Sequence, residues 1–182
     1  MAESTSFVKK FLGGVVEEEN YRTLVANFYF VYRALEEQID RNSDDPIIAP
    51  LAKMTELKRV PALEKDLAYF YGGSWFLDVD PSDACKTYID RILHCNMEEL
   101  VGHHYTRYLG DLSGGQMISK KVPVKGYYDF LGKGKEYKRI VKEIINEYLN
   151  TYQINVMAEV TYCFESATEL FKEMNEIGKP LV

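Results

Sequence analysis

Apolar residues recur at three- and four-residue steps along most of the chain, a spacing that places them on one face of an α-helix. The longest such stripe lies within residues 20–40 and consists of Leu24, Phe28, Val31, Tyr32, Leu35 and Ile39. Three shorter stripes follow: Leu63, Leu67 and Tyr71; then Ala84, Tyr88 and Ile92; then Leu100, His104, Tyr108 and Leu112. A fifth stripe, the last along the chain, contains Val156, Val160, Cys163, Phe164, Ala167, Leu170, Phe171 and Met174. No segment alternates apolar and polar residues as a half-buried strand does, so the pattern predicts an all-α fold of about six or seven helices.

Proline and glycine positions predict where these helices begin and end. The first is expected to end before Pro46, because the residue before a proline is pushed out of helical geometry. Asp80, followed by Pro81, is the expected N-cap of the third helix. The other expected elements are a helix stopped by Gly72, a long helix over 97–121, a loop over 122–134, a helix over 136–149 and a last helix that ends before Gly178. Since no linker or repeat separates them, residues 1–182 are expected to form one domain.

Composition places the chain among globular proteins without stabilising crosslinks. It has 182 residues, 46% apolar and 27% charged, which excludes intrinsic disorder and low complexity. The first residues lack the layout of a secretory signal, and no apolar run is long enough to span a membrane. The three cysteines, Cys85, Cys95 and Cys163, are odd in number and widely spaced. They are expected to be free thiols in a reducing compartment, so the protein is not expected to be secreted.

Charge is unevenly distributed along the chain. The net charge of −6 argues against nucleic-acid binding. Residues 120–142 nevertheless contain eight lysines and arginines against two acidic residues, a local net charge of +6. Such a segment suits an anionic ligand or an acidic partner, and a merely solvated face is the alternative. Lys138 and Lys142 lie four residues apart, so they share a helix face and could hold two carboxylates, although ordinary surface pairs have the same spacing.

The most unusual segment places Gly110, Gly114 and Gly115 inside an otherwise helical stretch. Each glycine costs a helix about 1 kcal/mol relative to alanine, so some other interaction must offset them. Close packing of a neighbouring helix is one explanation, and a kinked helix whose bare backbone lies against a flat ligand is the other. Asp111 lies among these glycines. It is expected either to cap a helix end at the kink or to position an ordered water over a reacting centre.

Histidine spacing does not predict a metal site. The sequence contains His94, His103 and His104, and none of them has a Glu three residues earlier, as helical di-iron sites require. His94 is expected at the surface, and His103 or His104 as a hydrogen-bonded core residue. No residue of the sequence is therefore expected to ligate a metal.

The run from His103 to Gln116, His-His-Tyr-Thr-Arg-Tyr-Leu-Gly-Asp-Leu-Ser-Gly-Gly-Gln, resembles the distal-helix motif of heme oxygenases. The resemblance extends to Tyr32 with residues 34–37, to residues 63–67 and 71–72, and to Leu170 with Phe171. It covers nearly the whole chain and is closest to cyanobacterial and algal members. It implies the heme oxygenase fold, and an enzyme that opens heme to biliverdin, carbon monoxide and iron using dioxygen and a reductant.

The resemblance also implies roles for individual residues. Asp111 would hold the water that donates a proton to dioxygen at the iron, with Arg107 and Tyr32 completing this catalytic network. Heme would lie on Gly110, Ser113 and Gly114. Lys138 and Lys142 would hold its propionates, near Tyr105 and Thr106. Further heme contacts would come from Phe164 and Phe171 and, on the proximal helix, from Phe7, Val8 and Phe11.

The family's axial histidine lies just upstream of an Ala-Glu pair that resembles Ala2-Glu3, so in this numbering it would precede Met1. The leading hypothesis is a heme oxygenase without a membrane anchor in this chain, in the cytoplasm or a plastid stroma. Its electron donor would be a ferredoxin or a reductase that docks near residues 120–142. The alternatives are a non-catalytic heme- or tetrapyrrole-binding protein and a purely structural helical protein.

Overall fold

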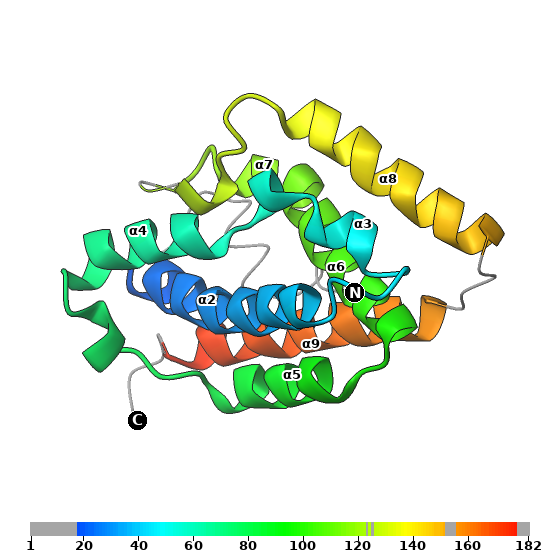
Figure 1. The fold of residues 1–182 in the computed structure, drawn as a ribbon. Coiled ribbons are helices and arrows are strands. Elements are labelled where there is room, and N and C mark those ends of the chain that lie inside the picture. The colour runs from blue at the N-terminus through cyan, green and yellow to red at the C-terminus, as the bar shows by residue number, and fades with distance from the viewer. Residues whose placement is uncertain (1–17, 123, 125, 152–155, 178–182) are drawn as a thin grey trace.

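The computed structural model describes residues 18–122, 124, 126–151 and 156–177. Its longer helices are α2 (Glu18–Arg41), α4 (Val60–Tyr71), α5 (Asp83–His94), α6 (Met97–Gly110), α8 (Gly134–Thr151) and α9 (Met157–Ile177) (Figure 1). Two short helices, α3 (Ala49–Ala52) and α7 (Gln116–Ile118), and three 3₁₀ turns, Thr55–Leu57, Trp75–Leu77 and Gly126–Tyr128, connect them. Within these ranges no strand occurs, and the all-α prediction is confirmed.

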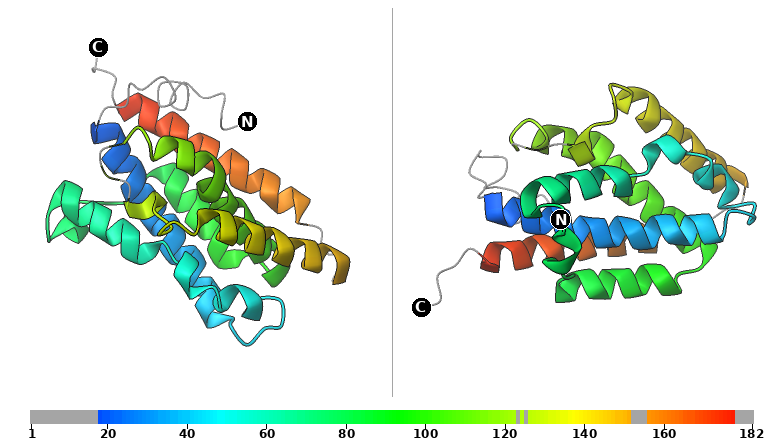
Figure 2. Two further views of the ribbon diagram at one scale, coloured as in Figure 1. Left: turned by 90° about the horizontal axis from the view of Figure 1, so that it is seen from above. Right: turned by 60° about the vertical axis from the view of Figure 1, so that its left-hand side comes forward.

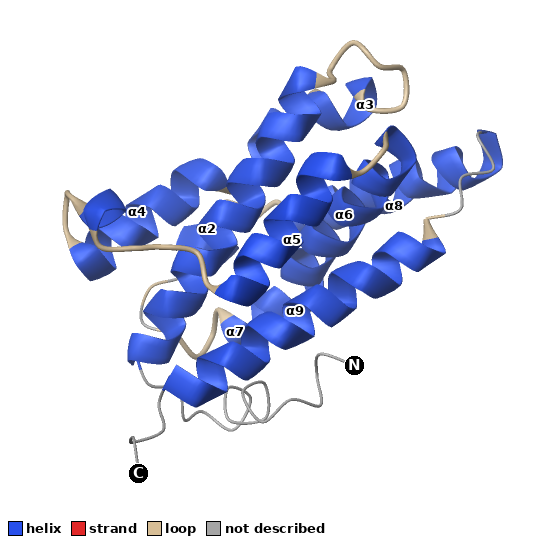
Figure 3. Ribbon diagram, turned by 90° about the horizontal axis from the view of Figure 1, so that it is seen from below, coloured by secondary structure: helices blue, strands red, loops and turns tan. Residues whose placement is uncertain are grey.

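Helix α2 is the centre of the bundle. It contacts α4, α5, α6 and α9, and Figure 1 shows it in blue between α4 and α5. Helix α8 packs on α6 and runs along the outside of the bundle (Figure 2). Helices α5 and α9 lie side by side, as Figure 3 shows from below. Two faces of α6 are therefore covered by different neighbours, α8 and α9.

The apolar stripes of the sequence form the core of this bundle. All six stripe residues of α2 are buried, as are Leu63 and Leu67 of α4 and Tyr88 and Ile92 of α5. Burying a side chain of this size contributes about 1.5–3 kcal/mol, so these stripes are the main source of cohesion between helices. Phe164 is the exception in the last stripe, because 51% of its surface is exposed.

Helix α5 begins later than the sequence predicted. Its N-cap is Ser82, whose Oγ accepts a hydrogen bond from the backbone N–H of Cys85 at 3.3 Å. The prediction that Asp80 and Pro81 begin this helix is therefore wrong by two residues. The hydroxyl of Ser82 provides the side-chain cap instead, because it lies three residues before the Cys85 amide.

The expected long helix over 97–121 is interrupted in the middle. It begins as predicted at Met97, where Asn96 and Glu99 form a capping box. After Gly110 the backbone changes to a π-helical turn, Asp111–Gly115, before α7 resumes. Single π-helical turns widen a helix locally and occur frequently at functional sites. The irregularity in the helix therefore falls on the segment that contains the three glycines.

A search of the described helices finds none long and apolar enough to cross a membrane.

Candidate functional site

The glycines of the π-helical turn fall into two groups. Among the described residues, a Cβ added to Gly110 or Gly114 would meet no atom within 4 Å, whereas one added to Gly115 would lie 2.7 Å from the ring of Tyr128. Helix packing therefore explains Gly115 but not Gly110 and Gly114. These two leave bare backbone beside open space, which is the arrangement expected where a flat ligand approaches a helix.

Asp111 lies directly next to this open backbone and is itself buried. Its Oδ2 accepts a hydrogen bond from the hydroxyl of Tyr32 on α2, and its Oδ1 accepts one from the hydroxyl of Tyr127 at 2.6 Å. The guanidinium of Arg107, one helical turn earlier, lies 3.7 Å from Oδ1. The structure thus brings together Asp111, Arg107 and Tyr32, the three residues singled out from the sequence as a network.

Burial and polar contacts act in opposite directions on this carboxyl. Burial raises the pKa of Asp111, and it outweighs Arg107, Tyr127 and Tyr32, all of which stabilise the charged form. A carboxyl whose pKa is displaced toward neutrality can exchange a proton more readily than an ordinary surface aspartate.

Arg107 is held by aromatic rings more than by its carboxylate partner. Its guanidinium carbon lies 4.6 Å from the centre of the Phe28 ring and 5.9 Å from that of Tyr32. Its Nε is buried without a hydrogen-bond partner among the described residues. The ring of Phe171 on α9 packs edge-on against Phe28 at 6.4 Å, so α9 supports this network from behind.

Tyr127 is the member of the network that sequence reasoning missed. It lies in the 3₁₀ turn Gly126–Tyr128, within a segment expected to be only a loop. Its backbone N–H donates to Oδ2 of Asp66 on α4 at 2.8 Å. A Cβ on Gly126 would lie 2.4 Å from Oδ1 of the same aspartate, so a larger residue there would displace this carboxylate. The Gly-Tyr-Tyr sequence was the available signal, but it has no periodicity that reveals a partner.

The two lysines of the predicted basic pair lie on α8, which packs against α6 and the π-helical turn. Lys138 is half-buried and Lys142 is exposed. Arg139 between them is paired with Glu143 at 2.7 Å, whereas Lys138 and Lys142 form no ion pair with any described residue. Both ammonium groups are therefore available to an anionic ligand.

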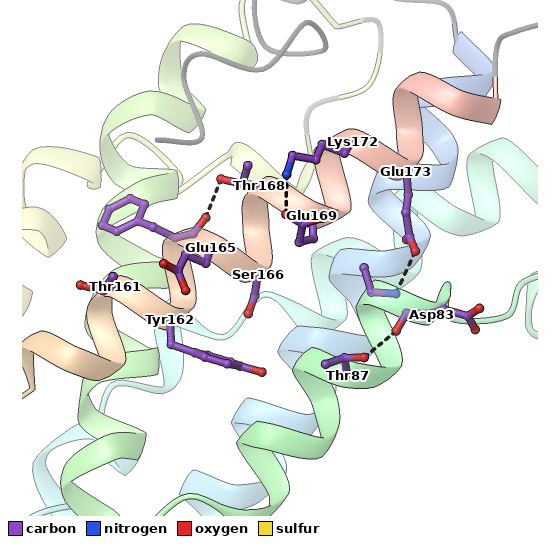
Figure 4. Close-up of a pocket in the computed structure, with 12 residues that line it drawn as sticks. Asp83, Thr87, Thr161, Tyr162, Glu165, Ser166, Thr168, Glu169, Lys172 and Glu173 are labelled. Carbon is purple, nitrogen blue, oxygen red and sulfur yellow. Dashed lines mark hydrogen bonds and ion pairs between the residues drawn. The ribbon is translucent and has the colours of Figure 1, made fainter.

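The other residues expected to contact the ligand differ in how deeply their side chains are buried. Thr106 is buried, and Tyr105 and Ser113 are half-buried. Phe164 lines a groove of about 1140 Å³ between α5 and α9, where Tyr162 and Ser166 face Thr87 (Figure 4). This groove lies apart from the Asp111 network. The expected proximal contacts Phe7, Val8 and Phe11 lie outside the described residues.

The three histidines are engaged elsewhere. His94 is exposed, as expected. Nε2 of His103 lies 2.7 Å from Glu159, and its Nδ1 lies 3.0 Å from the sulfur of Cys163. The ring of His104 packs at 4.4 Å on Tyr108. Within the described ranges, no group of three or more His, Cys, Asp or Glu side chains could hold a metal ion.

Comparison with known proteins identifies the family. The heme oxygenase family model matches residues 1–178. This chain belongs to the heme oxygenase family. A heme oxygenase of the red alga Porphyra purpurea is 42% identical over 96% of this chain and 80% of its own length. One of Pyropia yezoensis is 43% identical over 100% of this chain and 83% of its own length.

Solved structures of heme oxygenases have the same fold. Heme oxygenase-1 of the cyanobacterium Synechocystis, solved in complex with heme, superposes with a TM-score of 0.89 at 36% identity. The match covers 97% of this chain and 86% of that one. By family the chain is an oxidoreductase of the heme oxygenase type, and the alternative of a non-catalytic binding protein is not favoured.

Proposed function

We propose that the π-helical turn is the distal wall of a heme site and that Asp111 is its proton-handling group. The observation that carries this proposal is the position of a buried, multiply hydrogen-bonded carboxylate beside two glycines whose Cβ positions are empty. Heme supplies the iron and is also the porphyrin that is opened, with dioxygen and electrons as co-substrates. This chain's own side chains position the ring and handle the proton.

Gly110 and Gly114 fit a flat macrocycle. Methyl groups at these positions would hold a planar ligand away from the backbone, so glycine lets the ring approach at van der Waals distance. Ser113, between them, adds a hydroxyl near the same surface. Tyr105 and Thr106 lie about two turns earlier on α6 and contribute to the edge of the site. Phe171, through Phe28, supports the polar network behind it.

Asp111 is fixed well enough to orient a water. Tyr32 donates to one carboxylate oxygen, and Arg107 provides positive charge 3.7 Å from the other. Each oxygen keeps a further lone pair that can accept a hydrogen bond from an ordered water in the site. Because burial raises the pKa of Asp111, the carboxyl can pass a proton to this water and recover one from solvent.

Lys138 and Lys142 fit the two propionates of heme. Both lie on α8 beside the π-helical turn and form no ion pair with described residues. Two ammonium groups one turn apart can fix the rotation of the ring and hence the carbon at which it opens. The surrounding basic segment, residues 120–142, suits the acidic surface of an electron donor such as a ferredoxin, and a reductase could use the same surface.

Substitution of Asp111 tests the proposal. Asp111→Ala removes the proton-handling carboxyl but leaves Gly110 and Gly114 unchanged. We expect heme to bind with nearly unchanged affinity while biliverdin formation falls by about 100-fold or more, the usual range for a lost general acid. Equal turnover in the variant and the parent would refute this role.

The same experiment separates the enzyme from a binding protein that shares its fold. A chain that only binds heme would show no biliverdin in the parent either, with dioxygen and a reduced ferredoxin supplied.

We further propose that residues 1–182 act as one domain and work in the cytoplasm or a plastid stroma. Fractionation of the source cells tests the second statement.

A further inference from the structure

Two phenols hold the carboxylate of Asp111 from different elements of the fold. Tyr32 on α2 donates to Oδ2, and Tyr127 in the turn Gly126–Tyr128 donates to Oδ1 at 2.6 Å. We propose that Tyr127 is a positioning residue for Asp111, whose hydroxyl fixes the orientation of this carboxylate and favours its charged form. This proposal rests on the proposed function of Asp111.

The backbone around Tyr127 is anchored on both sides. Oδ2 of Asp66 accepts its N–H at 2.8 Å, and Nη1 of Arg59 donates to its carbonyl at 3.3 Å and to that of Asp129 at 3.0 Å. Gly126 lies so close to Asp66 that an added Cβ would push against its carboxylate. The hydroxyl of Tyr127 therefore reaches Asp111 from a turn that α4 and the residue before it hold in place.

The ring is fixed as tightly as the backbone. Tyr127 is fully buried, and its ring packs at 5.8 Å on Phe28 and at 5.9 Å on Tyr32. These are also the rings that flank Arg107. A donor held this rigidly loses little conformational freedom when it forms its hydrogen bond, so most of the bond's free energy is available to orient Asp111.

The electrostatic effect of this contact has a definite sign. Several charged and titratable groups face Asp111, and they come from each element packed around it: Arg107 from α6, Tyr21 and Tyr32 from α2, Tyr127 and Tyr128 from the turn, and Arg59 before α4. The hydrogen bond from Tyr127 stabilises the charged carboxylate, so its removal must raise the pKa of Asp111 further. A residue that only filled space would leave this pKa unchanged.

The first test needs no heme. The carboxyl carbon of Asp111 is followed by ¹³C NMR against pH in the heme-free chain, with Asp111→Asn used to assign the signal. Tyr127→Phe should move the titration to higher pH. The matched control is Tyr148→Phe, which removes another buried phenol that donates to a backbone carbonyl, that of Ile47. The control should titrate like the parent, and a Tyr127→Phe titration equal to both would overturn the proposal.

The second test uses the heme-loaded chain. Tyr127→Phe should lower kcat about tenfold, the effect of one lost hydrogen bond to a charged group, with heme affinity unchanged. Because a general acid loses activity as it ionises, the alkaline limb of its pH–rate profile should move in the same direction as the NMR titration. A fall in kcat without any movement of this limb would indicate a purely structural role and contradict the proposal.

A third variant keeps the test valid if Tyr127→Phe does not fold. Replacing Tyr127 with 3-fluorotyrosine preserves the shape of the ring but makes the phenol a stronger donor. The titration of Asp111 should then move to lower pH, opposite to the effect of phenylalanine, and no movement would overturn the proposal. If the parent forms no biliverdin, the proposed function fails, while the NMR titration still decides the role of Tyr127.

Discussion

Two buried carboxylates have pKa values shifted in opposite directions: Glu159, which packs against α6, and Asp111, in the π-helical turn that follows α6. Glu159 on α9 is bound by Arg91 through two hydrogen bonds of 2.6 and 3.0 Å and lies 2.7 Å from His103. Burial would raise the pKa of Glu159, but these partners outweigh it and lower the pKa instead. Asp111 has an arginine only at 3.7 Å, and burial raises its pKa.

This difference separates a structural charge from a chemical one. A carboxylate held by a bidentate arginine stays ionised and ties two helices together. A carboxylate held mainly by neutral phenols keeps its orientation but can still take up and release a proton. Asp111 also lies beside the open glycine backbone, whereas Glu159 lies where α6 and α9 approach closely at Gly102.

The largest expected effect comes from neutralising the two carboxylates in turn. Asp111→Asn should lower biliverdin formation by about 100-fold or more, because the proton-handling group is lost. Glu159→Gln should leave turnover per folded molecule nearly unchanged. It should lower the free energy of unfolding by about 2 kcal/mol, less than for a fully buried pair because Arg91 is 35% exposed. Urea unfolding and steady-state kinetics measure both, and equal losses of turnover would erase the distinction.

The second prediction concerns His104, where burial acts without a charged partner. Burial lowers the pKa of His104 from 6.5 to about 3. Below pH 6.5, His104 binds a proton in the unfolded chain but stays neutral in the folded chain. The free energy of unfolding therefore decreases as the pH falls below 6.5. Between pH 6.5 and 4 the loss should be about 3 kcal/mol.

Unfolding free energies of the parent and of His104→Phe, measured across that pH range, test this prediction. The variant should lose the part of the slope that His104 contributes, because it has no proton to bind there in either state. His103, whose pKa burial also lowers, to about 4, keeps its own part of the slope in both proteins. His94→Gln is the matched control, since it removes an exposed histidine instead of a buried one. An unchanged slope in His104→Phe would mean that burial shifts the pKa of His104 less than expected. It would also weaken the argument that burial raises the pKa of Asp111.

The third prediction compares Gly110, which borders open space, with Gly115, which packs against Tyr128. Gly110→Ala should stabilise the heme-free chain by up to about 1 kcal/mol, because its Cβ has open space in a helical backbone. The same substitution should weaken heme binding. Gly115→Ala should destabilise the chain by about 1–3 kcal/mol, because its Cβ would lie 2.7 Å from Tyr128. Thermal unfolding and heme titration measure both signs, and destabilisation by Gly110→Ala would contradict the ligand interpretation.

These comparisons also show what the sequence could and could not predict. The stripe of α2 was predictable because helical periodicity directly records which face is buried. Tyr32, Arg107 and Asp111 could be grouped because they belong to a motif that the chain shares with a family. Tyr127 could not be grouped with them, since its place depends on contacts of Asp66 and Arg59 with a turn far along the chain. Propensity rules do not encode such contacts.

The smallest expected effect belongs to Lys138 and Lys142, at the edge of the site rather than in its buried centre. Each is at least partly exposed, so solvent screens its attraction for a carboxylate, and one contact contributes about 0.2–1 kcal/mol. Replacing both with Glu should therefore weaken heme binding by about tenfold, far less than the effect of Asp111→Asn on turnover. It should also yield a mixture of biliverdin isomers, because the ring's rotation is no longer fixed.

A matched pair of charge reversals separates this local effect from the change in net charge. Lys53 and Lys65 are exposed lysines outside residues 120–142, on the side of α3 and α4. Replacing both with Glu lowers the net charge by the same four units but should leave heme affinity and the isomer pattern as in the parent. A heme analogue with esterified propionates should bind the parent and the Lys138→Glu, Lys142→Glu variant equally. If the analogue instead distinguishes the two, the lysines act through the fold or the general field and not as partners of the propionates.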